Sequence, residues 1–185
     1  KNKKTFFKVD TNQPSEILKN INKISKIYGP IYGLINTTYP KVLQKKKPNK
    51  INSELFLKEI NIHLGSFLNT TQIMCDYFLN KKIKGKIINF ASIYGEFIPR
   101  FEIYNNTKII APLQYSIIKN SIITMSKYFA KFFLKKKINI NCISPGGIYD
   151  YQDKNFVSRY SRFCAEGMLK KDDLEGVVFF LLSSA

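Results

Sequence analysis

Short runs of β-branched and aromatic residues alternate with longer stretches of helical periodicity along this chain of 185 residues. The strand-like runs lie at residues 5–9, 31–35, 86–90 and 138–143. The helical stretches begin near residues 14, 53, 113 and 172. Strands that are joined by helices form crossover units and a parallel sheet. The alternation therefore predicts an α/β fold, a doubly wound parallel sheet with helices on both faces.

Two helix starts carry local signals in the sequence. Pro14 suits the first turn of a helix, where its missing N–H is no loss. Asp172 and Glu175 have the spacing of a capping box, in which two side chains satisfy two backbone N–H groups. We therefore expect helices to begin at these two positions.

Polar residues and turn residues follow the strand-like runs at the points where the runs end. They are Asp10, Asn36, Ser92 and the pair Pro145-Gly146. Parallel sheets bind ligands outside the carboxyl ends of their strands. We therefore expect these residues to lie along one edge of the sheet and to mark the site.

A Tyr-x-x-x-Lys spacing occurs three times, at Tyr77/Lys81, Tyr104/Lys108 and Tyr115/Lys119. With 11 tyrosines in a lysine-rich chain the spacing arises by chance, so its context decides. The first pair is expected on the surface at the end of the long helix, and the second lies in a segment of poor helix propensity. The third opens a good helix, which puts both side chains on one face, about 5–6 Å apart at Cβ. Tyr115 and Lys119 are therefore the candidate catalytic pair.

The residue types at this pair suit proton transfer to a substrate oxygen. A free phenol has a pKa near about 10, too high for efficient proton exchange at neutral pH. An ammonium one helical turn away favours the phenolate, so Lys119 is expected to lower the pKa of Tyr115. The Ser92 hydroxyl, at a strand end, is expected to hydrogen-bond the same substrate oxygen. The alternative, that Ser92 is only a turn residue, stays open.

The formal charge of +17 comes almost entirely from lysine, and the lysines are spread along the chain. This distribution favours a solvated surface over nucleic-acid binding. The three cysteines lack paired spacing and His63 is the single histidine, so neither a disulfide framework nor a metal site is indicated. No apolar run approaches the about 18 residues of a membrane span. We therefore expect a cytoplasmic protein with no metal, no nucleic acid and no membrane partner.

Three segments carry further motifs. They read GKIINFASIYG at residues 85–95, YSIIKNSIITMSKYFA at residues 115–130 and INCISPGGI at residues 140–148. Together they resemble the serine-bearing strand, the catalytic helix and the nicotinamide loop of short-chain dehydrogenases/reductases of the classical type. The resemblance implies a Rossmann-like fold and an oxidoreductase that interconverts a hydroxyl and a carbonyl group by hydride transfer with NAD or NADP.

The resemblance also assigns residues and partners. It implies that Ser92, Tyr115 and Lys119 are catalytic and that Tyr115 and Lys119 also hold the cofactor. Its other cofactor-binding residues would be Asp10 at adenine, Asn36 at the family's Asn-Asn-Ala-Gly turn, Pro145, Gly146 and the backbone of Ile148 at the carboxamide. A small-molecule substrate is implied, and so is a homodimer or homotetramer that forms through the two long helices.

The chain departs from the family pattern at three places. The turn after Asn36 keeps only its first asparagine, and the asparagine of the family's catalytic tetrad aligns to Ile62, with Asn61 one residue out of register. Whether Asn61 replaces it stays open. The segment between Ser92 and Tyr115 is long and is expected to form a substrate-facing loop. These features resemble a bacterial subgroup associated with flagellin modification and surface amino-sugar synthesis, which suggests an amino sugar as substrate.

Both ends of the sequence are expected to be cut, since it starts at Lys1 without an initiator methionine and stops at Ala185. The family's glycine-rich phosphate loop would lie before Thr5. Residues 1–185 are therefore expected to form a single partial domain that lacks the first βαβ portion and the last strand. We expect this piece alone to be inactive and to bind the cofactor poorly, which calorimetry with NADH tests.

Two other functions stay open from the sequence. Sugar-nucleotide epimerases and dehydratases of the extended branch use the same Tyr/Lys pair for transient oxidation, and the downstream sequence would decide for or against them. A non-catalytic basic binding module of the same fold is the second, since the charge is high and the tetrad asparagine is missing. Salt-sensitive nucleic-acid binding without a response to cofactor would favour it.

Overall fold

A three-stranded parallel sheet organises the computed structural model, which describes residues 5–39, 48–107 and 109–183. The strands are β1 (Gly33–Asn36), β2 (Lys86–Phe90) and β3 (Asn139–Ile143), and they pair in the order β1-β2-β3. In the central strand Ile87 and Ile88 point to opposite faces, and both are completely buried. Burial on both faces is typical of a parallel sheet that helices cover on both sides.

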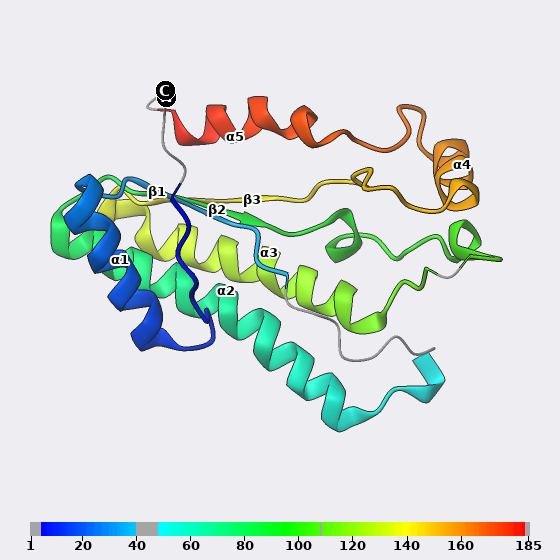
Figure 1. Cartoon of the computed structure of the whole chain (residues 1–185), viewed down its shortest axis with the longest axis horizontal. Coiled ribbons are helices and arrows are strands. Elements are labelled where there is room, and N and C mark those ends of the chain that lie inside the picture. Colours follow the sequence, from blue (N-terminus) through cyan, green and yellow to red (C-terminus); the bar gives the residue numbers. More distant parts are fainter. Residues whose placement is uncertain (1–4, 40–47, 108, 184–185) are drawn as a thin grey trace.

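Helices cover both faces of the sheet, as predicted. The first face carries α1 (Pro14–Tyr28), α2 (Ser53–Lys81) and α3 (Leu113–Phe133). The opposite face carries α5 (Glu175–Leu182), and α4 (Lys154–Phe163) lies beyond the carboxyl ends of the strands (Figure 1). The prediction of an α/β fold with a parallel sheet between two layers of helices is confirmed.

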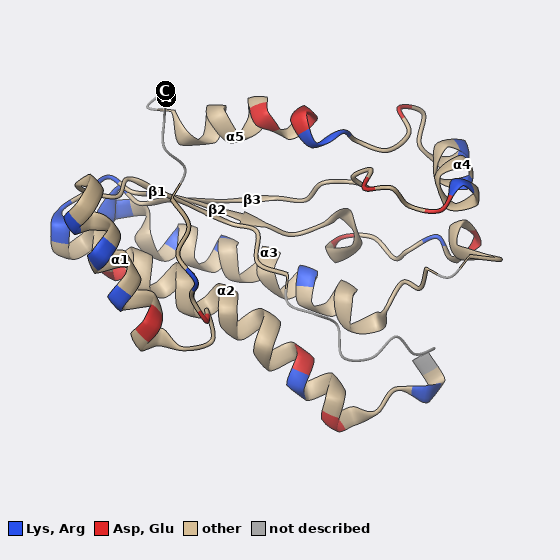
Figure 2. Ribbon diagram, viewed as in Figure 1, with Lys and Arg blue, Asp and Glu red and all other residues tan. Residues whose placement is uncertain are grey.

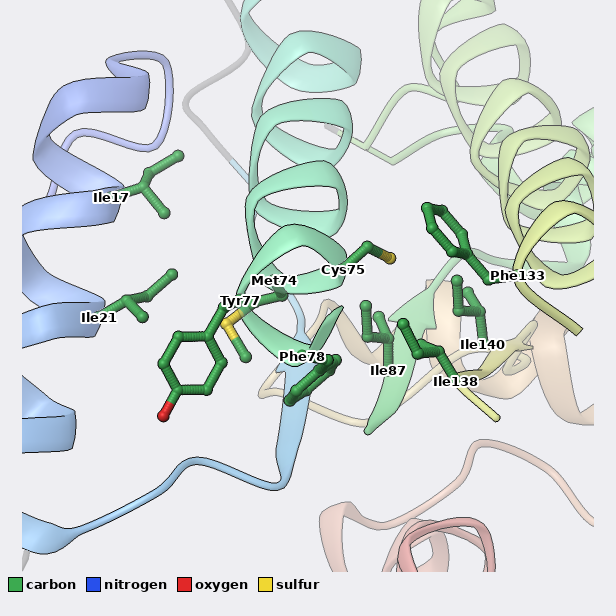
Figure 3. Close-up of a cluster of buried hydrophobic side chains, with 10 residues drawn as sticks. All are labelled: Ile17, Ile21, Met74, Cys75, Tyr77, Phe78, Ile87, Phe133, Ile138 and Ile140. Atoms are coloured by element: carbon green, nitrogen blue, oxygen red, sulfur yellow. The ribbon is translucent and has the colours of Figure 1, made fainter. Parts of the chain in front are cut away.

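The main hydrophobic core joins α1, α2 and α3 to the amino-terminal half of the sheet (Figure 3). Its buried members are Ile17, Ile21, Met74, Cys75, Tyr77, Phe78, Ile87, Phe133, Ile138 and Ile140. Close packing at Gly85 shows how tightly this region is filled, since a Cβ there would lie 2.0 Å from the Phe78 ring. The core therefore fixes the helices at the end of the sheet opposite to the carboxyl ends of the strands.

A second cluster lies under the carboxyl ends of the strands and joins α2 to α3. Its buried members are Phe67, Ala91, Ile118, Ile122 and Ile123. Beside it Asn89 Nδ2 donates to Ser126 Oγ at 2.9 Å, and Thr71 Oγ1 donates to Asn89 Oδ1 at 3.4 Å. These buried hydrogen bonds tie both long helices to β2, because unpaired polar groups at this depth would be costly.

The strand expected at residues 5–9 is absent from the described structure. Residues 5–10 are extended but join no sheet, and Phe6 is 88% exposed. Val9 does pack against the main core. A strand requires a neighbouring strand for its ladder of hydrogen bonds, so a β-branched run alone does not make one.

The last helix begins where the sequence predicts it, but through a different cap. Residues 171–174 form a turn of 3₁₀-helix that leads into α5. Asp173 Oδ2 accepts a hydrogen bond from the Lys170 N–H at 2.7 Å. The expected capping box between Asp172 and Glu175 is therefore replaced by one that begins two residues earlier.

Much of the positive charge gathers where helices end and strands begin (Figure 2). The lysines at this end are Lys81, Lys82, Lys84, Lys86, Lys135, Lys136 and Lys137. Cations near the C-termini of α2 and α3 complement the helix dipoles. The lysine run Lys45, Lys46 and Lys47 lies outside the described residues. No helix among the described residues is long and apolar enough to cross a membrane.

Candidate active site

A cavity of about 1300 Å³ opens at the carboxyl ends of β2 and β3. The predicted site residues that line it are Ser92, Tyr115, Lys119, Pro145, Gly146 and Ile148. The long segment between Ser92 and Tyr115 contributes Tyr104 and Ile109 to the wall, so this segment does face the cavity. Side chains of α4 and α5 close the cavity on other sides. The ends of β2 and β3 and the start of α3 therefore converge on one space, as expected for Ser92, Pro145 and Gly146.

Ser92 is buried at the turn that follows β2. Its Oγ accepts a hydrogen bond from the Tyr94 N–H at 3.2 Å. Asn120 Nδ2 on α3 donates to the Gly95 carbonyl oxygen at 2.8 Å. A Cβ on Gly95 would lie 2.7 Å from the backbone carbon of Lys119, so only glycine allows the turn to approach α3 this closely. Gly95 and Asn120 thus set the position of Ser92 relative to the candidate catalytic helix.

The Ser92 hydroxyl and the Tyr115 phenol line the same cavity, and Ser92 acts on the phenol as a hydrogen-bonding group. Burial raises the pKa of Tyr115, the Ser92 hydrogen bond opposes this shift, and the neighbouring Tyr94 adds to it. The expectation that Lys119, beside a cationic nicotinamide ring, lowers this pKa stays a prediction, because in this chain alone burial has the larger effect. Burial in a largely apolar wall disfavours the phenolate more than the nearby groups favour it.

Lys119 is buried, with 6% of its surface exposed. Its Nζ donates to the Phe90 carbonyl oxygen at 2.9 Å. Burial lowers the pKa of Lys119 to about 8, and the Cys142 thiol acts in the opposite direction. Near neutral pH the ammonium form still predominates, so a positive charge is held at the end of β2.

Two aromatic residues that sequence reasoning did not assign to the site lie beside it, Tyr39 against this pair and His63 behind Tyr39. Tyr39, in the turn after β1, contacts the Tyr115 ring edge-on with 5.6 Å between ring centroids. It contacts the ring of His63 on α2 in the same way at 5.1 Å. His63 itself is buried, with 2% of its surface exposed. Burial lowers its pKa, Glu59 raises it, and Lys119 lowers it further.

The loop after β3 is held by α4, a helix that the sequence analysis did not predict. Tyr160 Oη accepts a hydrogen bond from the Gly147 N–H at 2.7 Å. A Cβ on Gly147 would lie 2.9 Å from the Tyr160 ring, so the loop requires glycine here. Asp153 caps α4 by accepting hydrogen bonds from the N–H groups of Asn155 and Phe156. An aspartate before a stretch of helical periodicity was the available signal for this element.

Asp10 and Asn36 are not among the residues that line the cavity. Asn36 is buried, its Nδ2 donates to Thr70 Oγ1 at 2.7 Å, and its Oδ1 accepts from Thr38 at 2.7 Å. Asp10 is exposed and accepts a hydrogen bond from the Asn12 N–H. The structure therefore gives both side chains local partners, and their contact with a cofactor stays a prediction.

The other candidates from the sequence take different places. Tyr77, expected on the surface, is buried in the main core, and its hydroxyl accepts from the Ile31 N–H at 3.1 Å. Tyr104 lies in a 3₁₀ turn and donates to Tyr94 Oη at 3.0 Å, while Lys108 lies outside the described residues. Asn61, the possible substitute for the tetrad asparagine, is exposed. The described residues contain no group of three or more His, Cys, Asp or Glu side chains that could hold a metal ion.

Comparison with known proteins places this arrangement in a family. The family model described as enoyl-(acyl carrier protein) reductase matches residues 1–185. The chain is 36% identical over 166 residues to post-translational flagellin modification protein A of Campylobacter coli. It is 25% identical over 179 residues to 3-oxoacyl-[acyl-carrier-protein] reductase of Thermotoga maritima. These alignments cover 88% and 94% of this chain and 64% and 66% of the two relatives, less than two thirds of either.

Solved structures give the same result. The crystal structure of a short-chain dehydrogenase from Leptospira borgpetersenii with bound NAD⁺ superposes with a TM-score of 0.84 at 31% identity. The match covers 96% of this chain and 68% of that one. A short-chain dehydrogenase/reductase from Mycobacterium marinum matches with a TM-score of 0.78 at 19% identity, which supports the fold alone. The chain belongs to the short-chain dehydrogenase/reductase family.

Proposed function

We propose that this protein is an NAD(P)-dependent oxidoreductase that interconverts a hydroxyl and a carbonyl group. The observation that carries the proposal is that the Ser92 hydroxyl, the Tyr115 phenol and the Lys119 ammonium line one cavity, with Lys119 one helical turn from Tyr115. Carbonyl reduction requires a proton donor, a hydroxyl that binds the substrate oxygen and a fixed cation, and all three line this cavity.

Each residue has a role in this proposal that follows from its position. In the reducing direction Tyr115 donates its proton to the carbonyl oxygen of the substrate, and Ser92 donates a hydrogen bond to the same oxygen. The raised pKa of Tyr115 keeps the phenol protonated near neutral pH, which suits this direction. In the oxidising direction the phenolate would accept the hydroxyl proton, and the charge of Lys119 stabilises that phenolate.

The cavity suits a nicotinamide cofactor, which would supply or accept the hydride. Its volume of about 1300 Å³ exceeds the about 300–1,000 Å³ of a usual small-molecule pocket, so a nucleotide and a substrate can share it. Lys119 Nζ uses one N–H group for Phe90, which leaves donors for ribose hydroxyls. The backbone of Ile148 and the Pro145-Gly146 turn would hold the carboxamide end. The NAD⁺ bound to the Leptospira relative supports this cofactor class.

The finer proposal is that the substrate is an amino sugar or a related precursor of a surface glycan. The similarity to a flagellin modification protein supports it. The cavity wall supports it as well, because it places phenol hydroxyls of Tyr94 and Tyr104 and the amide of Gln152 near the candidate catalytic residues. Aromatic rings with polar edges suit a sugar, which has an apolar ring face and many hydroxyls.

We also propose the setting in which the enzyme acts. Residues 1–185 would form a single partial NAD(P)-binding domain. Subunits would associate through α2 and α3 into a homodimer or homotetramer, and exposed apolar side chains on α3 such as Tyr128 and Phe132 support this. A cytoplasmic location is consistent with three cysteines that carry free thiols.

Replacement of Tyr115 by phenylalanine in the full-length enzyme tests the proposed function. The assay follows oxidation of NADH and NADPH with a keto-derivative of N-acetylglucosamine as the probe substrate. We expect turnover to fall by about two to four orders of magnitude, the usual contribution of a general acid. Binding of the reduced cofactor, measured by its fluorescence, should change little because the ring remains. Turnover that survives the substitution unchanged would rule out the role of Tyr115 and, with it, this function.

A further inference from the structure

The ring of Tyr39 lies where three parts of the chain meet: the turn after β1, α2 and α3. It contacts the Tyr115 ring at 5.6 Å and the His63 ring at 5.1 Å, in both cases edge-on. Lys119 Nζ lies 5.6 Å from its ring centroid. Tyr39 is 49% exposed and lines the cavity, so part of its ring faces the candidate catalytic pair and part faces the space for a ligand.

The ammonium of Lys119 lies among three aromatic rings. Its Nζ is 5.6 Å from the centroid of Tyr39, 5.7 Å from that of Phe67 and 5.7 Å from that of Tyr115. Aromatic faces attract a cation, and the attraction is stronger where water is excluded. Phe67 is 1% exposed on α2 and Tyr115 is fixed on α3, whereas Tyr39 stands on a turn. The position of this third ring therefore depends on what packs against it.

His63 packs against Tyr39 from the side of α2. The charged groups that act on the imidazole are Glu59, one turn earlier on α2, and Lys119 on α3. Burial keeps the imidazole neutral at neutral pH. The turn itself is anchored by the hydrogen bonds of Asn36 to Thr70 and Thr38. A neutral ring and an anchored turn together hold Tyr39 against the pair on α3.

We propose that Tyr39, held in place by His63, is a positioning residue that keeps the Tyr115 phenol and the Lys119 ammonium in place for proton transfer. The proposal rests on the proposed function for its catalytic meaning. The contact on which it depends can be measured without turnover. If the contact between Tyr39 and His63 is not found, the positioning role is rejected and the proposed function still stands.

The contact is tested by nuclear magnetic resonance, because His63 is the only histidine of the chain and its imidazole signals need no assignment. Tyr39→Leu removes the ring and should shift the His63 imidazole signals, since the ring current of Tyr39 disappears. Tyr39→Phe keeps the ring and should leave them close to their original positions. Tyr32→Leu, at an exposed tyrosine beside β1, is the matched control and should not move them. His63 chemical shifts that stay unchanged in Tyr39→Leu would overturn the inference.

Kinetics tests the positioning role itself. In the full-length enzyme we expect Tyr39→Leu to lower kcat by about ten- to a hundred-fold, the cost of a misplaced reacting group, with a smaller change in KM. Tyr39→Phe should restore kcat to within about two-fold of the original, because the proposed role belongs to the ring. A variant that keeps its circular dichroism spectrum but shows an unchanged kcat would contradict the role.

A double-mutant cycle joins the two residues. His63→Ala removes the support of Tyr39 and should lower kcat in the same direction as Tyr39→Leu. The double variant should then be little worse than either single variant, because both remove the same placement. Losses that multiply would show that the two residues act independently, which overturns the role of His63. A double variant that fails to fold is replaced by Tyr39→Leu with His63→Gln, judged by the same criterion.

Discussion

Lys119 on α3 donates a hydrogen bond from Nζ to the carbonyl oxygen of Phe90, the last residue of β2, at 2.9 Å. The bond ties the start of α3 to the strand end that precedes Ser92. It also holds an ammonium in a position where only 6% of the residue's surface is exposed, and this burial lowers the pKa of Lys119 to about 8.

The lowered pKa of Lys119 predicts a pH-dependent stability. The ordinary lysine pKa is 10.5 and the folded value is about 8, so between these values the unfolded chain binds more protons. The contribution of this group to stability therefore rises with pH over that range and is constant below it. Relative to wild type, Lys119→Met should lose on the order of 3 kcal/mol of stability between about pH 7 and about pH 10.5.

Urea unfolding at several pH values measures this difference. Lys127→Met removes an exposed lysine from the same helix and controls for the general effect of charge. A stability difference between Lys119→Met and wild type that stays constant with pH would contradict the folded pKa of Lys119.

Gly95→Ala should displace the turn that carries Ser92. The new Cβ would meet the Lys119 backbone at 2.7 Å and the Asn120 nitrogen at 2.8 Å, and backbone atoms cannot move aside easily. We expect a destabilisation of about 1–3 kcal/mol and a loss of turnover, because Ser92 moves away from Tyr115. Thermal unfolding and kcat measure the two effects.

Gly176→Ala is the matched control for this change. A Cβ on Gly176 meets nothing within 4 Å, and the residue lies in α5. The substitution should leave turnover unchanged and raise stability by up to about 1 kcal/mol, as alanine favours helix. Equal effects of the two glycine substitutions would show that close packing at Gly95 is not what positions Ser92.

Asn36→Ala should lower the stability of the fold, and it should also weaken any contact that Asn36 makes with a cofactor. The amide serves two hydroxyl partners, Thr70 and Thr38, and one of them is buried. Removing it should cost about 1–3 kcal/mol, which denaturant unfolding measures without cofactor. Asn61→Ala, at an exposed position one residue from the one that aligns with the family's tetrad asparagine, should change stability by no more than about 0.5 kcal/mol. A stable Asn36→Ala with weaker cofactor binding would favour direct contact instead.

Local patterns in the sequence were sufficient to predict the three strands of the sheet and to bring Ser92, Tyr115 and Lys119 to one cavity, while their catalytic roles stay predictions. The run at residues 86–90 and the helix that begins at Leu113 appear as predicted, because their periodicity is fixed by near neighbours in the chain. Tyr115 was separated from Tyr77 and Tyr104 by helix context, and only Tyr115 combines a helical lysine partner with a position in the cavity.

Such local patterns do not predict contacts between residues that are far apart in the sequence. Tyr39 and His63 are 24 positions apart, and nothing local indicates that their rings meet. Residues 5–9 have strand composition but no pairing strand in the described structure. The direction of the Tyr115 pKa shift depends on how deeply the phenol is buried, which spacing alone does not reveal.

Tyr160→Phe should loosen the loop that follows β3. The substitution keeps the ring that packs on Gly147 but removes the oxygen that accepts the Gly147 N–H at 2.7 Å. Because Pro145 to Ile148 would hold the nicotinamide end, KM for the cofactor should rise by about three- to ten-fold, the equivalent of one ordinary hydrogen bond, while kcat changes less. Tyr128→Phe, at an exposed tyrosine on α3, should leave both constants unchanged. A fall in kcat alone would place Tyr160 in the chemistry instead of in the loop.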